Sequence, residues 1–129
     1  MTGTRAAVLV ALCLGGPAAW AQAGSDCRPG GTVAETNACA VRDFQQADSD
    51  LQVLYGDVMR ALSAHERPSL RQDQSAWQRT RITQCKAQQR SAEARPEWPR
   101  LYHECLLAQT RSRRAGLMHW LQHGEPPPN

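Results

Sequence analysis

The residues of this sequence best suited to chemistry are four cysteines, Cys27, Cys39, Cys85 and Cys105. They stand 12, 46 and 20 positions apart and include no C-x-x-C pair, which argues against a zinc site. An even number of cysteines in a short chain is typical of two disulfides when the protein is exported, and the N-terminus predicts export. We expect two bridges, and the spacing leaves their pairing open.

The histidines form no recognisable catalytic or metal-binding pattern. His119 and His123 are four positions apart, but no third ligand accompanies them, and positive side chains there suit the end of a helix. The sequence also lacks a G-x-S-x-G motif, a glycine-rich phosphate loop and a nucleophile beside a suitable histidine. We therefore expect a protein that is not an enzyme and that needs no metal and no cofactor.

A second group of interest is the segment QSAWQRTRITQC, residues 74–85, in which Trp77, Arg81 and Cys85 are four positions apart. On a helix they lie on one face. We expect Trp77 to pack between helices and Arg81 to stack against it, which contributes about 0.5–2 kcal/mol. A buried arginine also needs a carboxylate. The candidate carboxylates are Asp48, Asp50 and Asp57. The alternative role for Arg81 is ligand contact.

The first 23 residues, MTGTRAAVLVALCLGGPAAWAQA, have the pattern of a secretory signal peptide. Arg5 precedes an apolar run that is too short to span a bilayer, and small-x-small sites favour cleavage after Ala23, with Ala21 as the alternative. Neither Cys13 nor Cys27 follows a small residue, which argues against a lipoprotein. We expect a periplasmic or secreted bacterial protein without a transmembrane segment in its mature chain.

Length and charge narrow the class of protein further. The chain has 129 residues and a net charge of +3, which falls to +2 once Arg5 is removed. One domain fits this length, and so small a charge argues against nucleic acid as a partner. The basic run at 110–114, TRSRR, is interpreted as a solvated helix face, with anionic lipid or cell-wall polymer as weaker alternatives.

Apolar positions recur at intervals of three and four in three segments, and none alternates with period two. The pattern predicts helices from Thr32 or Glu35 to about 64, from Pro68 to about 90, and over 97–123. We expect an all-α, three-helix antiparallel bundle over residues 24–123, with the second helix against the first and the third folded over both. Residues 124–129 are predicted to be a disordered tail.

The ordered combination of four segments carries a family resemblance: TVAETNAC (32–39), ADSDLQVLYGDVM (47–59), LRQDQSAWQRTRITQC (70–85) and YHECLLAQTRSRRAGL (102–117). Together they resemble the LprI-type lysozyme inhibitor domain of bacterial envelope proteins. The one departure is Asp50-Leu51-Gln52, where the family more often has Leu-Asn. The matching positions are Cys27, Glu35, Cys39, Asp48, Leu51, Tyr55, Leu70, Gln74, Trp77, Arg81, Cys85, Tyr102, Cys105, Leu106, Thr110 and Arg113.

The resemblance implies local disulfides, Cys27–Cys39 and Cys85–Cys105. The rival pairing is Cys39–Cys85 with Cys27–Cys105. It further implies that the shared residues, with the Trp77–Arg81 pair among them, organise helix packing.

In function, the resemblance implies a protein that binds lysozyme and covers its cleft. The arginines expected outside the core are the candidate contacts, and they are Arg95, Arg100, Arg111 and Arg114. The alternative is a non-inhibitory periplasmic module or scaffold that contacts cell-wall polymer or an envelope protein. A mildly basic chain would gain no long-range attraction to a basic lysozyme. The oligomeric state does not follow from the sequence.

Overall fold

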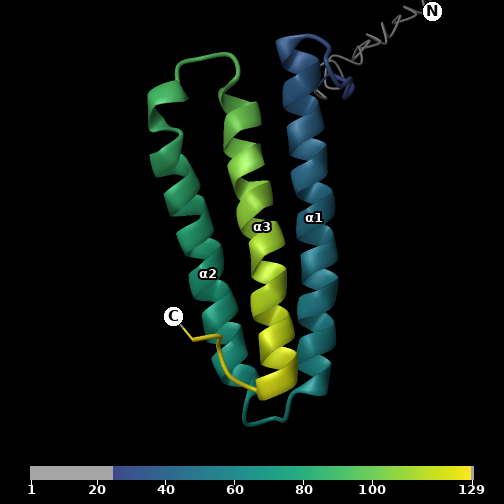
Figure 1. Ribbon diagram of the computed structural model, residues 1–129, viewed down its shortest axis with the longest axis vertical. Coiled ribbons are helices and arrows are strands. Elements are labelled where there is room, and N and C mark those ends of the chain that lie inside the picture. The colour runs from purple at the N-terminus through teal and green to yellow at the C-terminus, as the bar shows by residue number, and fades with distance from the viewer. Residues whose placement is uncertain (1–24, 129) are drawn as a thin grey trace, which may run out of the picture.

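The computed structural model describes residues 25–128, which form three long helices joined by short connections (Figure 1). No strand occurs within this range, so the all-α prediction is confirmed. The predicted signal peptide, residues 1–23, lies outside the described residues. The elements in chain order are α1 (Val33–Ala61), α2 (Arg67–Gln88), the 3-10 turn η1 (Arg90–Ala92) and α3 (Trp98–His123).

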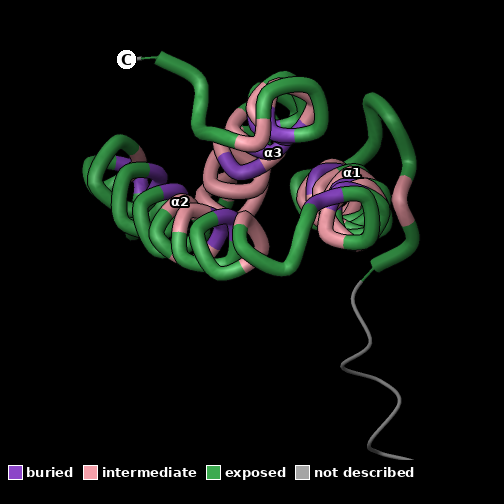
Figure 2. The backbone as a smooth tube through the Cα atoms, turned by 90° about the horizontal axis from the view of Figure 1, so that it is seen from below, coloured by how far each residue is buried: buried purple, intermediate pink, exposed green. Residues whose placement is uncertain are grey.

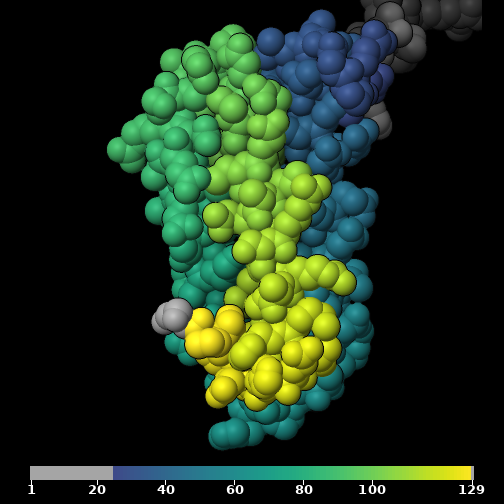
Figure 3. All heavy atoms as spheres, viewed as in Figure 1, coloured from purple at the N-terminus to yellow at the C-terminus, as the bar shows by residue number. Residues whose placement is uncertain are grey.

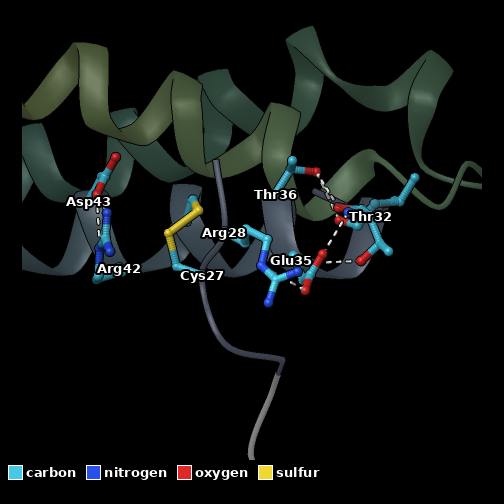
Figure 4. Close-up of a disulfide and its surroundings, with 9 residues drawn as sticks. Cys27, Arg28, Thr32, Glu35, Thr36, Arg42 and Asp43 are labelled. Carbon is cyan, nitrogen blue, oxygen red and sulfur yellow. Dashed lines mark hydrogen bonds and ion pairs between the residues drawn. A yellow bond between two sulfur atoms is a disulfide. The ribbon is translucent and has the colours of Figure 1, made fainter. Parts of the chain in front are cut away.

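The start of α1 is fixed by its own sequence. Thr32 is the N-cap, and its hydroxyl accepts the backbone N–H of Glu35 at 3.2 Å. The Glu35 carboxylate accepts the backbone N–H of Thr32 at 2.7 Å in return, which completes a capping box. Arg28 lies 3.6 Å from the same carboxylate, and Figure 4 shows these side chains beside the disulfide of Cys27. The N-terminal segment is therefore held against the first turn of α1.

The helices alternate in direction, but α3 and not α2 is the main partner of α1. Helices α1 and α3 run side by side in the same direction, and α2 runs opposite to both on the far side of α3 (Figure 1). The second helix runs antiparallel to the first and contacts it, as expected, through the hydrogen bond from Arg81 to Asp48, and α3 packs against both α1 and α2. Helix α2 buries only a narrow stripe of four residues, so its contact with α1 is small. That stripe consists of Leu70, Gln74, Arg81 and Cys85.

The apolar core lies toward the end of the bundle where α1 turns into α2. Val58, Leu70 and Leu117 are fully buried and represent one helix each, and Trp120 is 1% exposed. Figure 2 shows buried positions on the sides where the helices face one another and exposed positions around the outside. Burial of side chains of this size contributes about 1.5–3 kcal/mol each, so this cluster joins all three helices.

Two disulfides complete the fold, with the pairing that the family resemblance implies. Cys27 is bonded to Cys39, which attaches the N-terminal segment to α1. Cys85 is bonded to Cys105 across a Cα–Cα distance of 5.7 Å. The second bridge joins the last turn of α2 to α3, at the end of the bundle away from the apolar core.

The same end is closed by Asn37 of α1. Its side-chain amide donates to the carbonyl of Pro96 at 2.9 Å, and its carbonyl accepts the backbone N–H of Arg100 at 3.2 Å. Helix α3 has no side-chain cap from its own N-cap residue. Asn37 therefore satisfies an N–H group that a helix leaves without a partner in its first turn.

Glycine 56 lies within α1, where a glycine costs about 1 kcal/mol relative to alanine. A Cβ added there would have only the guanidinium of Arg60 within 4 Å, at 3.6 Å. No neighbouring helix approaches this position, so close packing does not explain the glycine. No described helix is long and apolar enough to cross a membrane.

Candidate functional site

The helix face that carries Trp77 and Arg81 forms a polar junction between the three helices. Arg81, 7% exposed, donates hydrogen bonds to the carboxylate of Asp48 at 2.6 Å and to the hydroxyl of Thr110 at 2.8 Å. Its guanidinium lies 4.6 Å from the ring centre of Trp77 and 5.2 Å from that of Phe44. One side chain of α2 therefore contacts both α1 and α3.

A second arginine makes a similar set of contacts and also lies near Trp77. Arg113 of α3 donates to the amide oxygen of Gln74 at 2.9 Å and to the carboxylate of Asp73 at 2.6 Å. Asp73 also accepts the indole N–H of Trp120 at 2.8 Å. The Arg113 guanidinium lies 5.5 Å from the centre of the Trp77 ring. Trp77 thus contacts two guanidinium groups, and each of these is paired with a carboxylate.

A groove of about 450 Å³ lies between α1 and α3, next to this junction. Leu51 and Thr110, both buried, belong to its lining. Asp43 and Asp50 line it from α1, and Arg111 and Arg114 line it from α3. The remaining lining residues are Gln46 and Ala47. Thr110 belongs to the groove and to the junction, because its hydroxyl also accepts the hydrogen bond from Arg81.

The family model of the lysozyme inhibitor LprI matches residues 25–117 of this chain. This chain belongs to the LprI family. An uncharacterized protein of Rhizobium meliloti (strain 1021) is 28% identical to this LprI-family chain over 138 residues, which cover 97% of the chain and 99% of the relative. No solved structure matches the chain.

Six of the sixteen LprI motif residues come together at the junction between the helices. Leu51 lies in the apolar core, and Tyr55 packs against it. Tyr102 lies elsewhere, stacked on Trp98 with their ring centres 5.0 Å apart. The residues that meet at the junction are Asp48, Gln74, Trp77, Arg81, Thr110 and Arg113. Their side chains are engaged with one another, so this cluster positions helices.

The four candidate contact arginines separate into two groups. Arg111 and Arg114 are exposed and share the α1–α3 groove. Arg100 is half-buried at the start of α3 and pairs with Glu104 at 3.0 Å, while Arg95 is exposed in the connection that precedes α3. Arg100 and Arg111 are eleven residues apart, about 16 Å along a helix, so the four arginines do not form one patch.

Two polar residues with structural roles escaped the sequence analysis. Asp73 accepts hydrogen bonds from both Arg113 and Trp120. It could have been identified from the sequence, because it precedes the motif residue Gln74 directly and lies four positions before Trp77. Asn37 bonds to residues 59 and 63 positions away, and nothing in its local sequence marks it. Contacts of such separation depend on the arrangement of the helices.

The sequence predicts no metal site, and the residues that the structure describes bring no group of metal ligands together. The rings of His119 and His123 lie 4.3 Å apart at the end of α3. Within residues 25–128 no group of three or more histidine, cysteine or acidic side chains could hold a metal ion. The geometry therefore gives this histidine pair no third partner for coordination.

Proposed function

We propose that this protein is an exported inhibitor that binds a peptidoglycan-cleaving muramidase and covers its substrate cleft. The observation that carries the proposal is the match of the LprI lysozyme inhibitor model over residues 25–117, which takes in all three helices. The N-terminal pattern of residues 1–23 supports export, and two disulfides suit an oxidising compartment.

The mechanism we propose is occlusion by a rigid surface. Muramidases act through two carboxyl groups on either side of the scissile bond, and a cationic side chain placed between them would compete with substrate. The bundle offers exposed arginines for this role on α3 and in the connection before it. The buried junction and the disulfides hold these elements in place, which lowers the entropy lost on binding. No catalytic role is assigned to this protein.

The test is a lysis assay with the oxidised mature chain, residues 24–129. Peptidoglycan cleavage is measured with chicken-type, goose-type and invertebrate-type lysozymes while the protein is titrated to a molar excess. Saturable inhibition of at least one type near an equimolar ratio is expected. The proposal fails if the folded protein, with both bridges formed, slows none of the three.

A second candidate function is a module that binds anionic cell-wall polymer. It is favoured by the charge of α2, which carries five basic residues and one acidic residue. Several of the basic residues are exposed on its outer face, namely Arg71, Arg79 and Lys86. Attraction to a polymer of this kind is screened by salt, so binding to isolated wall that collapses between about 50 and 500 mM salt would favour this function.

A further inference from the structure

We propose that the α1–α3 groove is the face that docks on the muramidase, with its arginine rim toward the catalytic carboxylates and its acidic rim toward the enzyme's basic surface. This inference rests on the proposed function and specifies its binding face. The groove has two rims of opposite charge, Asp43 and Asp50 on α1 and Arg111 and Arg114 on α3. Figure 3 shows the molecule from the side on which α3 lies in front of the other two helices.

The charges of the two rims do not neutralise each other across the groove. Asp43 pairs with its neighbour Arg42 at 2.9 Å, and Asp50 accepts a hydrogen bond from Gln46 of its own helix at 2.9 Å. Of the six ion pairs in the described part of the chain, none includes Arg111 or Arg114. Exposed guanidinium groups three positions apart lie on one helix face and can bind a carboxylate together.

A basic muramidase has the complementary pattern of charge. Its cleft contains two carboxyl groups, which suit the Arg111–Arg114 rim, and its surface outside the cleft is positive, which suits Asp43 and Asp50. The net charge of this chain would repel such an enzyme, but the charge is unevenly distributed. Helix α1 carries five acidic and two basic residues, and α2 has the opposite excess. Helix α3 carries four basic residues and one acidic residue, so the long-range attraction comes from the α1 side of the groove, and an approach that keeps α2 away from the enzyme is the favoured orientation.

The floor of the groove is held from behind by the junction. Thr110 is 1% exposed, accepts a hydrogen bond from Arg81 and donates one to the carbonyl of Leu106 at 2.7 Å. Arg81 is in turn bonded to Asp48 of α1. The residues that flank Thr110 along α3 therefore keep a fixed position relative to α1. The buried LprI motif residues Arg81 and Thr110 therefore support the exposed rims of the α1–α3 groove.

The first experiment removes the arginine rim. The double variant Arg111→Ala/Arg114→Ala is compared with Arg71→Ala/Arg79→Ala, which removes two exposed arginines from α2 and changes the net charge equally. The assay uses the muramidase that the wild-type protein inhibits. We expect the inhibition constant of the rim variant to rise about 30-fold or more, as at interface hot spots, and that of the control to change less than about threefold.

The second experiment tests the acidic rim by its kinetic effect. Asp43→Asn/Asp50→Asn is compared with Asp26→Asn/Glu93→Gln, which removes two exposed carboxylates elsewhere. Loss of long-range attraction should slow association about tenfold at low salt, with little change in the dissociation rate. The difference from wild type should shrink as salt is added.

The outcomes separate the inference from the proposed function. If wild type inhibits and both rim variants behave like their controls, another face binds, and the inference is wrong while the proposed function stands. If wild type inhibits no muramidase, the proposed function fails first. Circular dichroism of each variant verifies the helical fold, and a shift of the control to the same degree as the rim variant would indicate a general charge effect and overturn the inference.

Discussion

At the residue scale, the central feature is Trp77, which contacts two guanidinium groups that are each paired with a carboxylate. Spacing along the sequence was enough to place Trp77 and Arg81 on one face, and it gave Asp48 as one of three candidate carboxylates. The structure selects Asp48 because Asp57 pairs with Arg60 of its own helix and Asp50 lies on the groove. Sequence could not make this choice, since it depends on how α1 is rotated against α2.

The junction predicts a large effect for Arg81→Ala. The change leaves Asp48, whose side chain is 22% exposed, without its partner and removes the stacking on Trp77. Breaking a buried pair costs about 3–5 kcal/mol, and the partial exposure of Asp48 favours the lower end, about 3 kcal/mol. The measurement is urea unfolding with both disulfides intact.

A matched control is Arg79→Ala, an exposed position on the same helix that should change the free energy of unfolding by less than about 0.5 kcal/mol. Arg81→Lys keeps the charge but loses the planar group, so its effect should be intermediate. Equal free energies of unfolding for Arg81→Ala and Arg79→Ala would contradict the role given to the junction.

At the element scale, helix termini followed from sequence better than helix neighbours. The start of α1 was predicted at Thr32 or Glu35, which are the two members of its capping box, and Pro68 marked the start of α2, because these signals are local. The third helix lies against both others as predicted, but the larger contact of α1 with α3 than with α2 was not predicted, since apolar stripes show how much of a helix is buried and not which neighbour buries it. The hydrogen bond between Asn37 and the start of α3 could not be predicted for the same reason, because it depends on which helices are neighbours.

The N-terminus of α2 predicts a pH dependence of stability. Hydrogen bonds from the Ser63 hydroxyl and the Ser63 backbone N–H to the Glu66 carboxylate, each 2.8 Å, hold the pKa of Glu66 below its usual value of 4.5. A lowered pKa in the folded state stabilises the fold above pH 4.5, and the contribution is lost as pH falls through the folded-state value. Glu66→Gln should therefore be less stable than wild type at pH 7, and the gap should narrow toward pH 3.

Thermal unfolding of the two proteins at both pH values measures this gap. In a Ser63→Ala background, which lacks the hydroxyl donor, the effect of Glu66→Gln should be smaller, because the two residues interact. A gap between wild type and Glu66→Gln that stays constant from pH 7 to pH 3 would refute the interpretation.

Helix α1 offers a stabilising substitution at Gly56. Alanine fits there without a clash and favours the helix by about 1 kcal/mol. The matched control is Gly124→Ala, which should destabilise the fold, because Gly124 has a φ of 70° as the C-cap of α3 and its added Cβ would collide with the Glu66 carboxylate. Urea unfolding measures both, and a destabilised Gly56→Ala would show that the glycine has an unrecognised role.

At the scale of the whole molecule, an all-α fold and its two bridges could be predicted, since helical periodicity and cysteine number are properties of the sequence. The spacing alone left the pairing open, and the resemblance to the LprI family decided it. The α1–α3 groove could not be predicted, because Asp43 and Asp50 meet Arg111 and Arg114 only once α3 lies beside α1. The fold therefore separates Arg111 and Arg114, which share the groove, from Arg95 and Arg100, which lie outside it.

The Cys85–Cys105 bridge should contribute to stability because it closes a loop of 20 residues between two helices. The chain-entropy relation gives about 3 kcal/mol for a loop of this size. Cys85→Ala/Cys105→Ala should lose about that much free energy of unfolding while keeping its helical circular dichroism. A loss below about 1 kcal/mol would mean that the remaining contacts between α2 and α3 hold these helices together without the bridge.

The most direct test of muramidase inhibition is the cleavage of a soluble oligosaccharide by a muramidase during titration with the oxidised protein. A small soluble substrate separates an inhibitor of the enzyme from a protein that shields the cell wall. If this protein is an inhibitor, cleavage falls in proportion to added protein and ends near an equimolar ratio. Unchanged cleavage of the soluble substrate, with lysis of whole wall still slowed, would contradict the inhibitor function and establish wall binding instead.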